Sequence, residues 1–216
     1  MPEYQGEAAL ETGVTRTLHR HEMVGADLAY TSDFPFRERQ KVAIDSLMKT
    51  AATLDIVSFD QVAEDESLAV VVMIKCLTGH NVPSGVSFNR DVWVRISATS
   101  GTDTTFVSGL FDSDGNLDLE GTWDPDLKRF YSIAENRTEL GEIVFNNALK
   151  PLEERVLNYR FPLVGDPETL DLKVELLFRA LSPAFMESAG LPELATEEFI
   201  PVYTIDSDEA TIFLGG

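Results

Sequence analysis

The chain has 216 residues, of which 44% are hydrophobic and 25% are charged, a composition typical of a globular protein with one substantial core. Its 37 acidic residues outnumber 17 basic ones and give a formal net charge of −20, which argues against nucleic acid or an anionic membrane surface as a partner and favours divalent cations or basic proteins. The single cysteine, Cys76, excludes an internal disulfide and a cysteine-rich metal cluster, and its place in an apolar run predicts a buried, inert thiol.

The first part of the chain predicts an arm followed by a helix. Residues 1–33 are polar and show no sustained period, which is typical of an extended or irregular segment. From Phe36 to Leu54 apolar residues recur at helical spacing and predict an amphipathic helix, capped by Ser32 or Asp33. Its apolar face is expected to carry Ile44, Leu47, Met48 and Ala51.

Beyond about Phe59 the apolar residues recur with a period of two, which is typical of strands with one buried face. Turn residues between these runs predict a mainly β fold: an antiparallel β-sandwich at residues 59–216, behind an N-terminal arm and one amphipathic helix at residues 1–58. A short helix is expected from Ala184 to Ala189, after Ser182-Pro183. The predicted strands are Leu68–Leu77, Asp91–Ala98, Thr104–Gly109, Glu153–Phe161, Leu170–Leu181 and Ala210–Leu214.

A turn dense in backbone-shaping residues, Thr78–Gly85, joins the first two of these strands. Its sequence is Thr-Gly-His-Asn-Val-Pro-Ser-Gly, in which glycine can take a positive φ and Pro83 fixes its own φ. His80 lies between the two glycines of this turn, where a structural histidine is the commonest case.

An acidic segment, residues 112–126, holds six carboxylates and no basic residue. In its first half, oxygen-bearing side chains alternate on a glycine-containing turn, as a hard cation such as Ca²⁺ requires. The spacing is not that of an EF-hand, and a hairpin turn with a solvated acidic flank explains the same residues, so both interpretations stay open. The candidate calcium ligands are Asp112, Asp114, Asn116, Asp118 and Glu120.

The histidines are few, and two of them lie close together in the arm. His19 and His21 are two residues apart and would share one face of a strand. A surface pair explains them without a ligand, whereas a zinc site would need a third partner, either His80 or a carboxylate. Between Cys76 and His80 the Cys-x-x-Cys-His spacing of haem attachment is missing, which excludes a covalent haem within this chain.

Several segments together resemble the C-terminal, β-rich region of bacterial multihaem c-type cytochromes. The most specific is the Thr78–Gly85 turn, supported by Arg-Asp-Val-Trp at Arg90–Trp93 and by the Ser108–Leu117 segment. His19–Asp27 is similar to a histidine-containing segment of that family, and Met1–Gly6 is similar to the sequence that follows a Cys-x-x-Cys-His haem motif there. The upstream haem motifs of the family are absent from this chain, so it is either a piece of a larger cytochrome or a haem-free relative.

The resemblance implies a non-catalytic β-sandwich domain that serves as the scaffold or docking part of an extracytoplasmic electron-transfer protein. Its partners would be a haem-bearing segment or subunit, other electron-transfer proteins or further copies of itself. His21, His19 or His80 could then lend a lone pair as an axial ligand to a haem c held by that partner. No secretory signal, transit peptide or membrane-spanning segment is visible, and we expect any export signal to lie outside these residues.

Two other functions stay open from the sequence. One is a calcium-stabilised extracellular binding or adhesion module without a redox centre, which rests on the acidic segment. The other is a hydrolase that uses His80 with a neighbouring carboxylate, although no nucleophile elbow, Walker loop or dinucleotide fingerprint is present. We expect electron transfer through assembly rather than an enzyme.

Overall fold

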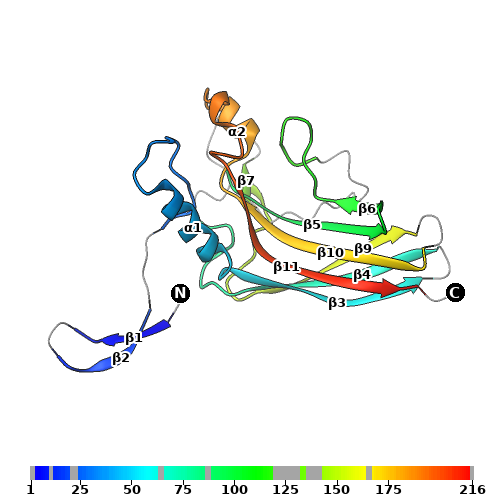
Figure 1. Ribbon diagram of the computed structural model, residues 1–216, viewed down its shortest axis with the longest axis horizontal. Helices are drawn as coiled ribbons and strands as arrows, with labels where there is room; N and C mark the ends of the chain where they lie inside the picture. Colours follow the sequence, from blue (N-terminus) through cyan, green and yellow to red (C-terminus); the bar gives the residue numbers. More distant parts are fainter. Residues whose placement is uncertain are drawn as a thin grey trace.

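The computed structural model describes residues 3–9, 12–19, 24–62, 66–85, 89–118, 132–134, 143–163 and 167–214. These residues form a mainly β protein whose two main antiparallel sheets pack as a β-sandwich, which confirms the fold class predicted from the sequence (Figure 1). A helix lies at one end of the two layers, and the C-terminus lies at the other (Figure 1).

The larger layer contains the strands β5 (Asp91–Ser100), β6 (Asp103–Ser108), β10 (Thr169–Arg179) and β11 (Val202–Phe213). Their order is β11-β10-β5-β6, and every neighbouring pair is antiparallel. The register of β10 with β5 sets Arg179 opposite Asp91 and Phe178 opposite Val92. Because successive side chains of a strand point to opposite faces, the side chains of Phe178 and Arg179 lie on opposite faces of this sheet.

The smaller layer contains β3 (Ala52–Val62), β4 (Ser67–Cys76) and β9 (Glu154–Pro162), in the order β3-β4-β9. β4 is central in this sheet, and alternate residues of it are fully buried, as its predicted strand requires. The thiol of Cys76 is buried, as predicted. The core between the two sheets includes a stacked pair of rings, Phe106 and Phe161, with their centroids 4.3 Å apart.

Carboxylates of β11 close one side of the sandwich against β3. Asp206 Oδ2 accepts a hydrogen bond from the Leu54 N–H at 2.9 Å, and Asp208 Oδ2 accepts one from the Ile56 N–H at 2.8 Å. These side chains satisfy edge amides of β3 that no neighbouring strand pairs with, which blunts an open sheet edge. β11 therefore begins eight residues before the predicted strand Ala210–Leu214, and its polar residues have a structural role.

The helix α1 (Arg37–Met48) is shorter than the predicted helix from Phe36 to Leu54. Phe36 takes the N-cap position with φ 68°, and no side chain caps the first turn, so the prediction of Ser32 or Asp33 as the cap is wrong. Ile44 and Met48 are buried as predicted, whereas Leu47 is exposed.

The predicted helix ended too late because residues 52–54 belong to a strand. Ala52 and Leu54 are both buried, with a partly buried residue between them, so burial alternates there as in a strand, although the same two residues also fit a helical spacing. The expected division of the chain at residue 59 falls inside β3, and α1 packs against β11.

Several smaller elements complete the described chain. The short helix α2 (Pro183–Ser188) is as predicted, and Ser182 caps it by accepting the Phe185 N–H at 3.2 Å. A single 3₁₀ turn, η2 (Pro192–Leu194), follows it. The N-terminal arm contains a hairpin that stands apart from the sandwich (Figure 1), where only an extended or irregular segment was expected. The remaining strands are β1 (Glu3–Glu7) and β2 (Thr15–His19), which form this hairpin, and the pair β7 (Ser132–Ala134) and β8 (Ile143–Asn146).

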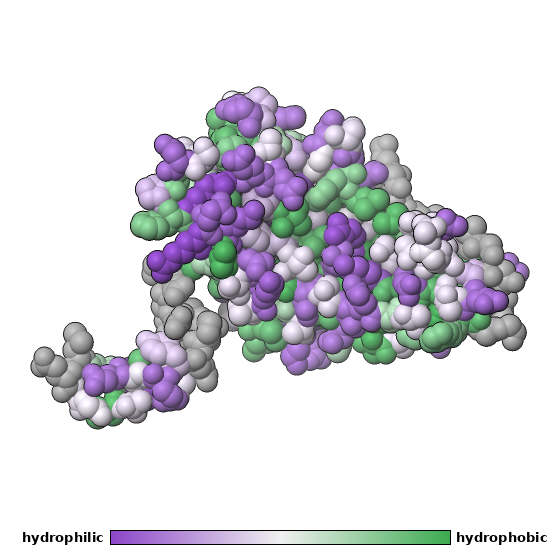
Figure 2. Space-filling model, in the orientation of Figure 1, coloured by the Kyte–Doolittle hydropathy of each residue, from purple (hydrophilic) through white to green (hydrophobic). Residues whose placement is uncertain are grey.

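None of the helices in the described residues is long and apolar enough to cross a membrane. On the face shown in Figure 2, hydrophilic side chains gather over α1, and hydrophobic ones are scattered among polar neighbours over the strands.

Candidate functional site

The Thr78–Gly85 turn is fastened to the body of the sandwich on both sides. The residue before it, Leu77, donates its N–H at 2.9 Å to the carbonyl of Ala51, next to the start of β3. Val82 exchanges two backbone hydrogen bonds with Leu149, at 2.9 and 2.8 Å. The Val82–Pro83 peptide bond is cis, and Gly85 has a positive φ of 70°, a conformation that the sequence allows for this glycine. The hydrogen bonds on both sides hold the turn against the sandwich, where it forms a wall.

A second wall is formed by the loop that precedes α1. Gln40 fixes this loop to the helix, because its side-chain carbonyl accepts the Ala29 N–H and its amide donates to Asp27 O, both at 3.1 Å. The buried Arg37 donates from Nε to Ala29 O at 3.0 Å and from a second nitrogen to Glu198 O. The loop, the helix and the segment after η2 are thus tied together.

Between these walls lies an open, mostly apolar cavity of about 290 Å³. Its floor includes Phe178 of β10, and the C-terminal end of α1 closes one side. The polar residues that line it are Thr50, residues of the turn and one arginine, Arg90. The lining residues are Gly25, Ala26, Leu47, Met48, Thr50, Ala51, Thr78, His80, Asn81, Val82, Pro83, Ser84, Gly85, Arg90 and Phe178. We call this space the turn cavity.

Among the described residues that line the turn cavity, Arg90 is the one that carries a charge, and its side chain is only 11% exposed. Nη2 donates to Asp27 Oδ2 at 3.0 Å, and the guanidinium carbon lies 5.8 Å from the centre of the Phe178 ring. Its Nε and Nη1 atoms are buried and have no hydrogen-bond partner in the described part of the chain. Burial, assisted by the Asp27 charge, raises the pKa of the nearby Tyr30, and the charge of Arg90 opposes that shift.

His80 is exposed at the turn cavity, and a hydrogen bond fixes its tautomer. Its Nδ1 lies 3.0 Å from Asn81 O, and because a carbonyl oxygen can only accept, Nδ1 must carry the proton. In the neutral ring Nε2 is then the nitrogen with the lone pair, and it has no hydrogen-bond partner among the described residues. The backbone here is held by Thr78, whose hydroxyl donates to His80 O at 2.6 Å. This histidine is therefore presented as a lone-pair donor on a fixed turn.

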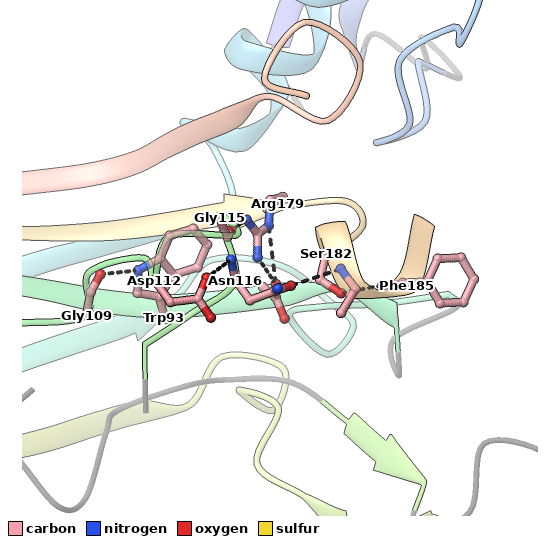
Figure 3. Close-up of polar contacts among 10 residues, drawn as sticks. Trp93, Gly109, Asp112, Gly115, Asn116, Arg179, Ser182 and Phe185 are labelled. Carbon is pink, nitrogen blue, oxygen red and sulfur yellow. Dashed lines mark hydrogen bonds and ion pairs between the residues drawn. The ribbon is translucent and has the colours of Figure 1, made fainter. Parts of the chain in front are cut away.

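Two other segments of the family resemblance meet on the opposite face of the larger sheet, around Arg179 (Figure 3). Arg179 pairs with Asp91 at 2.8 Å and donates from Nη1 to Gly115 O at 2.6 Å. Its guanidinium lies over the rings of Trp93 and Phe111, 5.9 and 4.7 Å from their centres.

The Trp93 indole N–H donates to Gly109 O at 3.1 Å, and the Trp93 side chain is fully buried. Gly109 has a φ of 82°, and a Cβ on it would lie 2.5 Å from Val94 O, so the turn requires glycine. We call Arg179, its neighbours Asp91, Trp93, Phe111 and Gly115, and Gly109, which binds Trp93, the arginine cluster.

The acidic turn next to the arginine cluster uses its oxygen atoms for hydrogen bonds within the protein (Figure 3). Asp112 Oδ1 accepts the N–H groups of Asp114 and Asn116, at 3.0 and 2.8 Å. Asn116 Oδ1 accepts the Ala184 N–H at the start of α2, at 2.9 Å. In the described residues no three His, Cys, Asp or Glu side chains converge to hold a metal ion. Asp118 lies on this turn and Glu120 lies outside the described residues, so the calcium site stays a prediction.

The three histidines named from the sequence are not all described. His80 lies at the turn cavity, His19 ends β2 without a described side chain, and His21 lies outside the described residues. Sequence reasoning missed Arg90 as a site residue, although it belongs to the Arg-Asp-Val-Trp segment of the resemblance. A lone arginine ahead of an apolar strand is the available signal, because such a position places the charge at the end of a sheet.

No model of a protein family matches the chain, and no curated protein matches it. Among solved structures, the chain is similar to a penta-heme cytochrome c552 from Thermochromatium tepidum, with 19% sequence identity and a TM-score of 0.49. The match covers 78% of this chain and 41% of that one, so this chain spans about two-fifths of that cytochrome's length.

Proposed function

We propose that this chain is a haem-docking β-sandwich, a non-catalytic part of an extracytoplasmic multihaem electron-transfer protein. In this role His80 offers Nε2 as an axial ligand to a haem c held by another segment or subunit. The observation that carries the proposal is the bond between His80 Nδ1 and Asn81 O, which leaves Nε2 as the lone-pair nitrogen of an exposed ring.

The hydrogen bond from His80 Nδ1 to a carbonyl oxygen is an arrangement that ligating histidines use. A histidine ligand commonly donates its other N–H to a carbonyl or carboxylate, which fixes the ring and makes it a better donor. Here Asn81 supplies that carbonyl, and the Thr78 hydroxyl holds the backbone of the same residue. The haem would supply the electron-accepting iron, and this chain's residues would orient the ligand and cover one side of it.

Charge supports a docking role of this kind. A formal net charge of −20 favours association with a basic surface, and such steering acts over the range of a Debye length, about 10 Å at 0.1 M salt. The segments of the chain that resemble multihaem cytochromes also supply the turn that carries His80.

The proposal is tested by titrating the chain into an N-acetylated octapeptide that carries haem c, with its own histidine on one side of the iron and an open position on the other. We expect a six-coordinate, low-spin absorption and EPR spectrum at neutral pH. The affinity should be about tenfold or more above that of N-acetylhistidine methylamide, because docking adds contacts that the free ligand lacks. His80→Gln should lower the affinity of the chain for the haem peptide to that of N-acetylhistidine methylamide.

His19→Gln and His21→Gln are the matched controls, because each removes an imidazole from the arm and leaves the turn intact. Both should bind the haem peptide as the unmodified chain does. If either of them removes the low-spin spectrum, the arm holds the haem and the assignment to His80 is wrong. Affinity no higher than that of N-acetylhistidine methylamide contradicts docking itself.

A further inference from the structure

We propose that the turn cavity binds an organic carboxylate with an apolar body, and that Arg90 is the residue that recognises the carboxylate. The inference goes beyond the haem-docking role, since it holds whether or not His80 binds iron. The carboxylate could belong to a free organic acid or to the side chain of a porphyrin, and the experiment below separates these sources.

The hydrogen bonding of the Arg90 guanidinium is incomplete. Its guanidinium has one partner, Asp27 at 3.0 Å, while Nε and Nη1 are buried with no hydrogen-bond partner in the residues that the structure describes. A buried donor without an acceptor is costly, and more so when it is charged. An incoming acceptor at this position therefore gains more than it would from an arginine that water already solvates.

The other well-buried arginines of the described chain have acceptors for their nitrogens. Arg37 donates to two backbone carbonyls, Arg155 to Glu153 and Asn147, and Arg179 to Asp91 and Gly115. In each of these three side chains, Nε and the terminal nitrogens contact carbonyls or carboxylates. Arg90 alone among these four keeps buried nitrogens without an acceptor, and it is the one of the four that lines the turn cavity.

The turn cavity beside Arg90 is mostly apolar and has a polar opening. Apolar side chains of Met48, Val82, Pro83 and Phe178 line much of the turn cavity, and the exposed turn residues form a polar mouth. Its volume of about 290 Å³ suits a small organic acid, or one edge of a larger ligand. An inorganic anion would fill the charge requirement and leave the apolar walls unused, so a carboxylate with an apolar body is the better match.

The Arg90 guanidinium has to move before it can reach a ligand in the turn cavity. Because Nε and Nη1 are covered, a carboxylate meets them only after the end of the Arg90 side chain turns toward the turn cavity. The present partner, Asp27, is 50% exposed, and ion pairs with such exposed carboxylates are weak. A bidentate carboxylate can replace or share that contact at little cost.

The test uses calorimetry and NMR titration of the whole chain with four probes. Hexanoate and its neutral analogue hexanamide test the small-acid source, and zinc protoporphyrin IX and its dimethyl ester test the porphyrin source. We expect at least one of the two acids to bind and its neutral analogue to bind about tenfold more weakly or not at all. Whichever acid binds identifies the source of the carboxylate.

Arg90→Met removes the proposed recognition group, and Arg39→Met, at an exposed arginine of α1, is the matched control. The first should lose about tenfold or more in affinity for the acid, and the second should keep it. Ala51→Phe, which fills the turn cavity without touching the charge, should also abolish binding and keeps the test decisive if Arg90→Met fails to fold. Binding that survives Arg90→Met in a folded chain, binding that survives Ala51→Phe, or the absence of binding by both acids would overturn the proposal.

Discussion

Two buried arginines lie at the same end of β10, one on each face of the larger sheet. Arg179 is 3% exposed and contacts Asp91, Gly115 O and two aromatic rings. Arg90 is 11% exposed, lies over Phe178 and has one ionic partner, Asp27, among the residues that the structure describes. The neighbouring residues Phe178 and Arg179 thus separate the two sites by the thickness of one sheet.

The hydrogen bonding of the two arginines indicates the role of each charge. A buried guanidinium with a full set of acceptors fixes the loops that supply them, and its removal leaves those acceptors stranded. A buried guanidinium whose donors lack acceptors contributes little to the stability of a fold, but those donors can recognise an anion. We therefore assign Arg179 to the structure of this end of the molecule and Arg90 to ligand recognition.

The largest effect should come from removing Arg179. Arg179→Met leaves Asp91 as a buried carboxylate without its partner, and we expect the free energy of unfolding to fall by about 3 kcal/mol or more. Arg90→Met should change the free energy of unfolding by about 1 kcal/mol or less. The carboxylate of the lost ion pair, Asp27, is half exposed, and the two buried donors of Arg90 that lack an acceptor are removed with the guanidinium. Urea unfolding of both variants measures the difference. Equal losses in the two variants would contradict the division of roles.

A smaller loss should follow from a methyl group at Gly109, which supports the arginine cluster. Gly109→Ala forces a positive φ on alanine and brings its Cβ to 2.5 Å from Val94 O, at a cost of about 2 kcal/mol. Gly101→Ala is the matched control, since Gly101 has a φ of 59° and open space around it. Thermal unfolding should show a clearly smaller loss for the control. Similar losses would mean that the close approach to Val94 contributes nothing.

The acidic turn should lose about 1 kcal/mol in Asp112→Ala, because two backbone N–H groups lose their acceptor. The loss should already be present in EDTA, since these hydrogen bonds need no metal. A further loss that appears only with added calcium is what the calcium site predicted from the sequence requires. Unfolding of both chains in EDTA and in calcium chloride separates the two roles.

The smallest effect concerns Tyr30, whose pKa reports the charge beside the turn cavity. Burial and then Asp27 raise this pKa, while Arg90 lowers it, so Arg90→Met should raise it further and Asp27→Asn should lower it. With its pKa raised in the folded state, Tyr30 contributes full stability below the unfolded value of about 10 and loses it as the pH rises above that value. Tyrosine-labelled NMR titration measures the shifts, and shifts of opposite sign would contradict this placement.

The sequence predicted the strands whose residues alternate cleanly. Along most of β4 and β10 every second residue is buried, so the buried residues share one face of the strand. This alternation is local, and the sequence shows it without knowledge of the neighbouring strands. The start of β11 could not be predicted, because Asp206 and Asp208 bind edge amides of β3, 152 residues away. The end of α1 was placed too late since the strand residues Ala52 and Leu54 also fit a helical spacing.

The site was predicted in part. The turn with His80 could be found from its glycines and Pro83, since these residues shape the backbone wherever they occur. Arg90 could not be assigned a role, because hydrogen bonds that are absent are a property of the folded surroundings and leave no trace in the sequence. The two arginines stand in ordinary sequence contexts and differ only in what the fold brings to them.

The most direct test of the haem-docking role is the paramagnetic broadening of backbone amide signals when the ferric haem c octapeptide binds. Docking at His80 predicts strong broadening at Gly79 and Gly85 of the turn, and none at Gly101 at the far end of β5 or at Gly13 of the β1–β2 hairpin. Broadening centred on Gly13, with the turn unaffected, would place the haem on the arm and contradict the account.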